Sequence, residues 1–353
     1  MAKTQGPPVK PVVGRGPTFI TRLMESRGLG WAGLAVGLLA PLVIATPYAL
    51  NVMTSAVIFV MLAVGLNIVV GYCGLLDLGY AAFFAVGAYT SGILATEFDV
   101  PLLATIPAVI VVTVIAGIVV GAPTLRLRSD YLAIVTLGFG EIIRIVATNL
   151  DVTGGPSGIY GIPGLSAFGV DLSEPVVFYW VAVLITALAV LFAARLGRSR
   201  LGRAWRFVRE DEDAAEASGI HTYRVKLAAY IAGAVWGGLA GVLFAGQLSA
   251  ISPASFTFLQ SALVLMAVVL GGMGSTPGVI IGAVFISLLP ELLRDLADYR
   301  FFAFGVLLIV VMLVRPQGLW PHRSTESART AARTPADDRA GPAEPATDSK
   351  GAS

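Results

Sequence analysis

Long apolar segments recur along most of this chain and limit what it can fold into. Only 13% of the 353 residues are charged, well below the ~25% typical of soluble domains. Each apolar segment has the length of about 20 residues that an α-helix needs to cross the hydrocarbon core of a bilayer. The sequence therefore predicts an all-α, polytopic transmembrane helical bundle.

We expect about ten transmembrane helices, with eight or nine full crossings as the alternative. They are predicted at residues 31–50, 52–71, 79–97, 102–122, 131–149, 176–194, 227–246, 257–272, 277–293 and 301–315. Ten crossings place both termini on one side of the membrane. Basic residues precede the first helix, follow the last and concentrate in loops on that same side, so the positive-inside rule predicts cytoplasmic N and C termini.

The two ends of the chain differ in composition from the apolar middle. Residues 1–30 are rich in proline, glycine and basic residues and are expected to form a cytoplasmic segment without a cleavable signal peptide. Residues 31–320 would form the transmembrane domain. Residues 321–353 have almost no large apolar side chains and cannot bury a core, which predicts a disordered cytoplasmic tail.

Two apolar stretches are interrupted by glycine-rich segments, GYCGLLDLGY at 71–80 and LGGMGSTPG at 270–278. Unwound backbone at membrane depth is tolerated only where protein or a water-filled cavity covers it, and paired interruptions in a transporter point to its transport path. The alternative is close helix packing through small residues. The pathway candidates in these segments are Asp77, Tyr80, Gly271 and Gly272.

Charged residues also occur inside the apolar segments. Glu141 and Arg144 are three residues apart and therefore share a helix face. Placing such groups in hydrocarbon costs about 2.5–3.5 kcal/mol each, so they should pair or face a cavity. They either line a polar pathway for a zwitterionic solute or form an internal pair that positions the helix near its outer end. Asp77 similarly either lines a pathway or caps a helix that begins near Gly79.

The loop at 151–164, DVTGGPSGIYGIPG, is predicted to face outward. Its glycines and prolines are typical of an ordered, turn-rich segment. It either receives a soluble partner or only connects the fifth and sixth helices.

One long charged segment, 195–226, lies between the sixth and seventh predicted helices and is expected to be a cytoplasmic loop. Arg203, Arg206 and Arg209 recur at helical spacing, which predicts a basic, interfacial extension of a helix. Acidic residues at 210–213 favour the start of a short helix there, and Gly219 would end it. So short a helix needs support from its own bundle or from a partner's groove. A solvated loop is the alternative.

The core of this segment, DAAEASG, resembles the EAA-x-x-x-G motif of ABC-importer permeases, with Asp213 in place of the usual glutamate and Ala214, Ala215 and Gly219 in the other positions. Four further blocks resemble the LivM-type permease of branched-chain amino-acid ABC importers. These blocks are residues 65–94, 125–159, 268–294 and 308–320. The pattern departs at Tyr80, where many relatives have histidine, and at Asp211, where asparagine is common.

The resemblance implies a permease subunit that translocates leucine, isoleucine or valine across a bacterial inner membrane. It implies three kinds of partner: a LivH-type permease, two cytoplasmic ABC ATPases and an extracytoplasmic solute-binding protein. The implied ATPase-coupling residues are Glu210, Asp211, Glu212, Asp213, Ala214, Ala215 and Gly219. A permease for urea or a short-chain amide is the alternative within the family.

The sequence also limits other function classes. It has no G-x-x-x-x-G-K-[ST] phosphate loop, so ATP would be used by partner subunits rather than bound here. With two histidines and one cysteine, no metal cluster is expected. No constellation of nucleophile and base indicates an enzyme, and no nucleic-acid partner is expected. An ion-coupled secondary transporter, with Asp77 or Glu141 as its proton site, is the alternative from another class.

Overall fold

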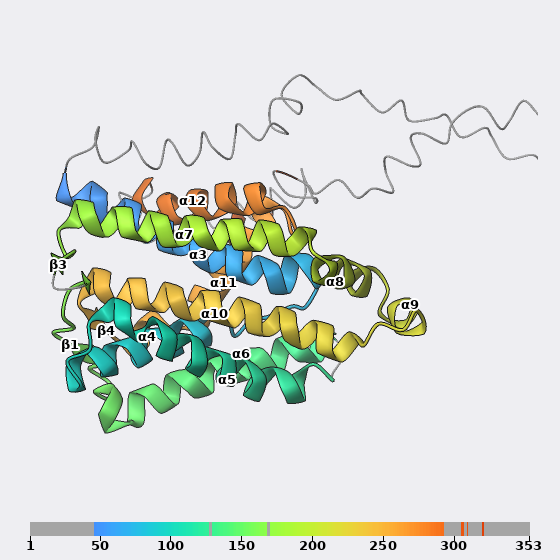
Figure 1. Cartoon of the computed structure of the whole chain (residues 1–353), viewed down its shortest axis with the longest axis horizontal. Coiled ribbons are helices and arrows are strands. Elements are labelled where there is room, and N and C mark those ends of the chain that lie inside the picture. The colour runs from blue at the N-terminus through green and yellow to red at the C-terminus, as the bar shows by residue number, and fades with distance from the viewer. Residues whose placement is uncertain are drawn as a thin grey trace, which may run out of the picture.

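The computed structural model describes residues 46–126, 129–167, 170–292, 305–306, 309 and 320. Within them the chain forms a bundle of long helices with short connections (Figure 1). Six of the described helices are long and apolar enough to cross a membrane. The predicted N-terminal segment, the C-terminal tail and most of the first and last predicted spans lie outside the described residues, so the topology of the termini stays a prediction.

Each predicted span from 52–71 to 277–293 has a helix in its place. The long helices are α3 (Pro47–Leu66), α4 (Ala81–Glu97), α5 (Ile106–Thr124), α6 (Ser129–Asn149), α7 (Pro175–Arg198), α10 (Thr222–Leu248), α11 (Phe258–Gly271) and α12 (Thr276–Leu292). Two shorter helices, α8 (Arg200–Glu210) and α9 (Glu212–Ala217), join α7 to α10. A π-helical segment, η1 (Asn67–Tyr72), continues α3 without a break.

The remaining elements are short. They are the 3-10 turns η2 (Leu102–Thr105), η3 (Asp151–Thr153) and η4 (Pro253–Ser255), and the strands β1 (Ile159–Tyr160), β2 (Ser166–Ala167), β3 (Val170–Asp171) and β4 (Ala250–Ile251). Strand β1 pairs antiparallel with β4, and β2 with β3. The predicted all-α bundle is confirmed for the described residues, with these two-residue strands as its only sheet structure.

The predicted helix break near residue 51 is wrong. Helix α3 begins at Pro47, directly after the extended Thr46, and runs through Asn51. Proline is well suited to the first turn of a helix, because its fixed φ is helical and its missing N–H has no partner there. Asn51 is exposed, and its carbonyl oxygen accepts a hydrogen bond from Gln247 Nε2 at 3.0 Å. A polar side chain at the helix surface therefore did not end the helix.

Helix α10 forms the centre of the bundle, where it packs against α3, α4 and α5. Small residues allow this close approach. A Cβ added to Gly87 of α4 would lie 2.1 Å from the Gly238 carbonyl oxygen of α10, so the two backbones are in contact there. This is the close helix packing through small residues that is common in membranes. It holds the first turn of α4 in the interior of the protein.

The bundle has two distinct ends (Figure 1). At one end β1 pairs with β4, which brings the connection after α6 beside the end of α10. We call this the strand end. At the opposite end α8 and α9 connect α7 to α10, and α9 extends farthest from the bundle. We call this the α9 end.

Candidate functional site

The charged segment 195–226 at the α9 end is mostly helical and is not a loop along its whole length. Helix α7 continues to Arg198 and α10 already begins at Thr222, so only residues 199–221 lie between them. The predicted basic extension of the preceding helix is in fact a separate helix, α8. Ser199 separates the two with an extended backbone, φ −72° and ψ 176°, and its Oγ accepts a hydrogen bond from Gly202 N. This serine cap starts a new helix in a new direction.

Helix α8 is held against the bundle by specific contacts. The side chain of Trp205 is fully buried, and its Nε1 donates to the Val225 carbonyl oxygen of α10 at 2.7 Å. Arg206 donates to the carbonyl oxygen of Gly197 in α7, and Arg209 to that of Gly71 in η1. The side chains of these two arginines therefore attach α8 to neighbouring helices of the bundle.

Helix α9 has the local structure that the sequence predicts. The Asp211 carboxylate caps it by accepting from Ala214 N at 2.9 Å. At its other end Gly219 has φ +83°, Gly219 N donates to Glu216 O at 2.9 Å, and Ile220 N donates to Ala215 O at 3.1 Å. This pair of bonds is a Schellman motif, which uses glycine because an L side chain disfavours positive φ. The prediction that Gly219 ends the helix is confirmed.

One face of α9 is attached to the bundle and the others are open. Lys226 of α10 is buried, with 8% of its side chain exposed, and it pairs with Glu212 of α9. Ala215 is also fully buried. Asp213 and Glu216 are exposed. Helix α9 is therefore fixed in place and presents an acidic surface away from the bundle.

The two glycine-rich interruptions meet next to α8. The Asn67 Oδ1 of η1 accepts from Gly274 N at 2.9 Å. A Cβ added to Gly71 would lie 2.6 Å from the same Gly274 nitrogen, so the backbones approach closely. Arg209 bonds to the Gly71 carbonyl oxygen from the other side. We call Asn67, Gly71, Gly274 and Arg209 the glycine junction. A π-helical segment at this position is notable, because such segments are frequent at functional sites.

The second interruption is a tight turn between packed helices. A Cβ added to Gly271 would lie 2.3 Å from the Gly278 carbonyl oxygen. Gly272 has φ +110°, which favours glycine, and its carbonyl oxygen accepts from Ser275 N at 3.1 Å. These contacts favour the small-residue packing interpretation of this segment.

The first interruption leads from η1 to a helix that starts inside the protein. Asp77 is fully buried, and its Oδ1 accepts from Gly79 N at 2.8 Å. It therefore caps the turn before α4, which begins at Ala81, two residues after Gly79. The hydroxyl of Tyr80 donates to the Gly233 carbonyl oxygen at 2.9 Å. The second carboxylate oxygen of Asp77 has no hydrogen-bond partner in the part of the chain that the structure describes.

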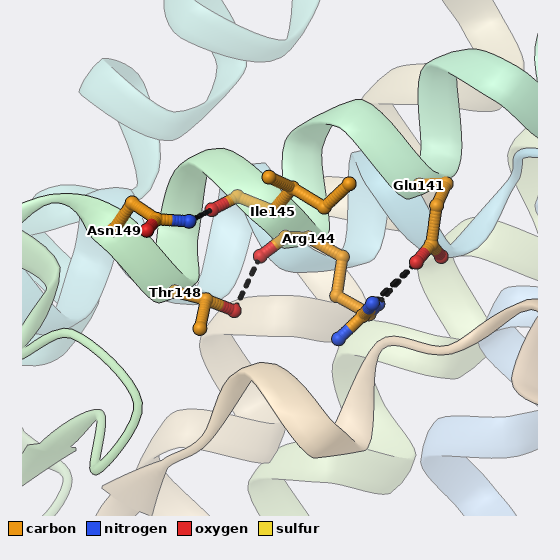
Figure 2. Close-up of polar contacts among 5 residues, drawn as sticks. All are labelled: Glu141, Arg144, Ile145, Thr148 and Asn149. Carbon is orange, nitrogen blue, oxygen red and sulfur yellow. Dashed lines mark hydrogen bonds and ion pairs between the residues drawn. The ribbon is translucent and has the colours of Figure 1, made fainter.

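Glu141 and Arg144 form the predicted ion pair on one face of α6 (Figure 2). Arg144 Nε donates to Glu141 Oε1 at 3.0 Å. Glu141 lies midway along the candidate span Tyr131–Asn149, and Arg144 lies five residues before its end. Both side chains are partly exposed, 42% for Glu141 and 31% for Arg144.

Glu141 borders a shallow groove of about 180 Å³. It is lined by Leu78, Ala81, Leu137, Gly140, Glu141, Phe256, Thr257, Phe258 and Ser261. The groove lies where α4 and α11 begin, and its Ser261 hydroxyl accepts from Ala81 N at 2.9 Å. It combines two phenylalanines with a few polar groups, and its volume is below the ~300–1,000 Å³ of typical small-molecule sites.

The structure brings only some of the pathway candidates together. Glu141 lines the groove, and Asp77 and Tyr80 lie on either side of its lining residue Leu78. Gly271 is at the opposite end of α11 from the groove-lining Phe258 and Ser261. Sequence reasoning missed Trp205, Lys226 and Asn67. A usable signal existed for Asn67, an amide inside an otherwise apolar run.

The fold and this site define a class: a multi-pass helical membrane protein whose longest charged connection is built around a short, presented helix. Residues 48–314 match the family described as the permease component of branched-chain amino acid transport systems. The chain belongs to that family.

Curated relatives agree with this family assignment. The high-affinity branched-chain amino acid transport permease LivM of Salmonella typhimurium and that of Escherichia coli are each 41% identical over 335 residues, covering 87% of this chain and 79% of the relative. The LivH permease of Escherichia coli is 32% identical over 154 residues, covering 43% of this chain and 49% of the relative. No solved structure gives a significant match. The resemblance to LivM-type permeases is confirmed.

Proposed function

We propose that this chain is the transmembrane permease subunit of an ABC importer that moves leucine, isoleucine or valine across a bacterial cell membrane. The observation that carries the proposal is α9: within a chain of this family, it is a short acidic helix attached on one face and open on the others. The α9 end would be cytoplasmic, and so would both termini, including residues 1–30 and the tail at 321–353.

The proposed role of α9 is to dock in a cleft of an ATPase subunit. The coupling residues would be Glu210, Asp211, Glu212, Asp213, Ala214, Ala215 and Gly219. Closure of the ATPases would then move α9, α8 and the attached ends of α7 and α10 as one unit. The Lys226–Glu212 pair and the buried Trp205 support this, because each ties the charged segment to α10. ATP would be hydrolysed by the partner subunits, and this chain would not act as an enzyme.

The proposed pathway runs beside α6. Glu141, the charged residue that lines the groove, and its ion-pair partner Arg144 would contact the charged ends of the amino acid. Asp77 and Tyr80 would fix the turn that forms its inner wall. Gly271 and Gly272 would shape the helix turn at the far end. A LivH-type permease would supply the other half of the pathway, and an extracytoplasmic binding protein would deliver the solute.

Reconstitution tests the proposal directly. The chain is co-purified with a LivH-type permease and two ABC ATPases and is placed in proteoliposomes with the binding protein. We expect ATP-dependent uptake of labelled leucine that unlabelled valine, but not urea, competes away. Competition by urea alone would instead support the amide-importer alternative. Uptake by this chain alone, driven by a proton gradient without ATP, would show a secondary transporter.

Substitution of Gly219 tests the role of α9. No atom lies within 4 Å of an added Cβ, so the constraint is the positive φ rather than space. An L side chain in this left-handed conformation costs about 1–2 kcal/mol, and asparagine tolerates it better than valine does. We expect Gly219→Val to lose ATPase-driven uptake while still inserting in the membrane, and Gly219→Asn to keep most of it. Normal uptake and normal solute-stimulated ATP hydrolysis in Gly219→Val would contradict the coupling role.

A further inference from the structure

The described helices differ in what they expose at the middle of the membrane. In the middle of α5 and α7 the exposed large side chains are apolar, for example Ile115 and Ile118 on α5 and Leu184 and Leu188 on α7. Such faces suit contact with lipid. Helix α6 instead exposes the Glu141–Arg144 pair halfway along its span. Among the described spans, α6 is the one with partly exposed charges at its midpoint.

Exposure of these charges to lipid would be costly. A charged side chain at the centre of a membrane helix costs about 2.5–3.5 kcal/mol. Glu141 lies about 12 Å along the helix axis from Asn149, at 1.5 Å per residue, which is too far for its short side chain to reach the aqueous interface. Pairing uses one carboxylate oxygen of Glu141, since both contacts from Arg144 go to Oε1. The pair therefore needs a polar, protein-lined neighbour.

The same face of α6 leaves room for a second helix to approach. Ile134, Gly138, Glu141 and Ile145 recur at the spacing that places residues on one helix face. A Cβ added to Gly138 meets nothing within 4 Å, whereas most glycines in the bundle interior are tightly enclosed. Ile134 and Ile145 are 68% and 49% exposed. Small residues beside apolar ones allow transmembrane helices to pack closely.

We propose that this face of α6, residues Ile134, Gly138, Glu141 and Ile145, is the contact surface for a second, related permease chain, whose polar groups complete the Glu141–Arg144 pair. This inference rests on the proposed function. The choice of a related chain over a second copy comes from the relatives: in Escherichia coli two different proteins named as permeases of a high-affinity branched-chain amino acid transport system both match this chain. The groove beside Glu141 would then open onto the seam between the two permeases.

Site-specific photo-cross-linking in the complete complex tests the surface. A benzophenone amino acid is placed at Ile134 or Ile145, with Leu184 and Leu188 of α7 as matched controls of similar exposure. We expect irradiation to join the α6 positions to the LivH-type chain and to leave the α7 positions without that adduct. Adducts within this chain, with a second copy of it, or at the α7 positions instead would overturn the proposal.

A substitution at Gly138 tests the same surface by co-purification, so the result does not depend on the yield of cross-linking. Gly138→Trp has open space in the isolated chain, so we expect normal insertion and thermal stability but loss of the second permease on co-purification. Leu188→Trp should keep it. Retention of the second permease by Gly138→Trp would count against the surface. If the chain binds the ATPases but its α6 positions give no adduct, only this inference is overturned. If the wild-type chain does not bind ATPases at all, the proposed function is overturned.

Discussion

At the scale of single residues, Asp77 shows two properties that can be tested separately: an acceptor oxygen and a charge. Asp77 is fully buried, and its Oδ1 accepts the Gly79 N–H that closes the turn before α4. Its negative charge is a separate property, which the proton-site alternative would need. A substitution that keeps the acceptor and removes the charge separates the two roles.

We expect Asp77→Asn to fold and to support ATP-driven uptake, because the amide oxygen can still accept from Gly79. Asp77→Ala leaves that buried N–H without its acceptor, which costs about 1–3 kcal/mol. Thermal unfolding in detergent should show the alanine variant as the less stable of the two. Equal loss of stability in both variants would mean that the charge itself is required. Loss of uptake in an Asp77→Asn variant that remains stable would favour the proton-site alternative.

At the scale of elements, α8 is held in position by one large buried side chain and by hydrogen bonds from its arginines. Trp205 is buried between α8 and α10 and also bonds to the Val225 carbonyl oxygen. The other ties of α8 come from arginine side chains that bond to carbonyl oxygens of α7 and η1. Together with the smaller buried side chain of Val208, the indole therefore supplies the apolar contact that keeps α8 against the bundle.

Trp205→Ala should detach α8, since truncation of a buried aromatic residue costs about 3–5 kcal/mol. Trp205→Phe keeps the aromatic packing and loses one hydrogen bond, at about 1 kcal/mol. Limited proteolysis of residues 199–221 in the membrane measures the difference, with Phe207→Ala, on an exposed position of the same helix, as the control. Equal protection of wild type and Trp205→Ala would show that other contacts hold α8.

At the scale of the whole molecule, the glycine junction links parts that are far apart in the sequence. Through it the Arg209 side chain of α8 bonds to η1 and lies beside Gly274 in the turn between α11 and α12. In the proposed importer, this places the segment next to α9 in direct contact with two helix interruptions. Movement of α8 would therefore reach them without an intermediate element.

Arg209→Ala removes the bond from α8 to the Gly71 carbonyl oxygen. We expect the reconstituted complex to keep its basal ATP hydrolysis but to lose most of the stimulation by solute and binding protein. Arg203→Ala is the matched control, because Arg203 is an exposed arginine of α8 whose side chain donates to the Arg198 carbonyl oxygen, five residues earlier in the chain. Full stimulation in Arg209→Ala would exclude the junction as a coupling contact.

The sequence was informative wherever structure depends on near neighbours. The membrane spans, the Glu141–Arg144 pair and the cap at Gly219 follow from helix length, spacing of three residues and chain reversal by glycine. The break expected at Asn51 was wrong because a surface amide does not end a helix. The ties of Trp205, Lys226 and Asn67 could not be predicted, since each joins residues that only the folded bundle brings together.

Helix α10 is attached to other elements at both of its ends. Its last turn leads through Ser249 into β4, which pairs with strand β1. Its first turn carries Lys226, which holds α9. Between them α10 runs unbroken for 27 residues, a span of about 40 Å. In the proposed importer, a partner that binds at the strand end and one that binds α9 would thus contact opposite ends of one continuous helix.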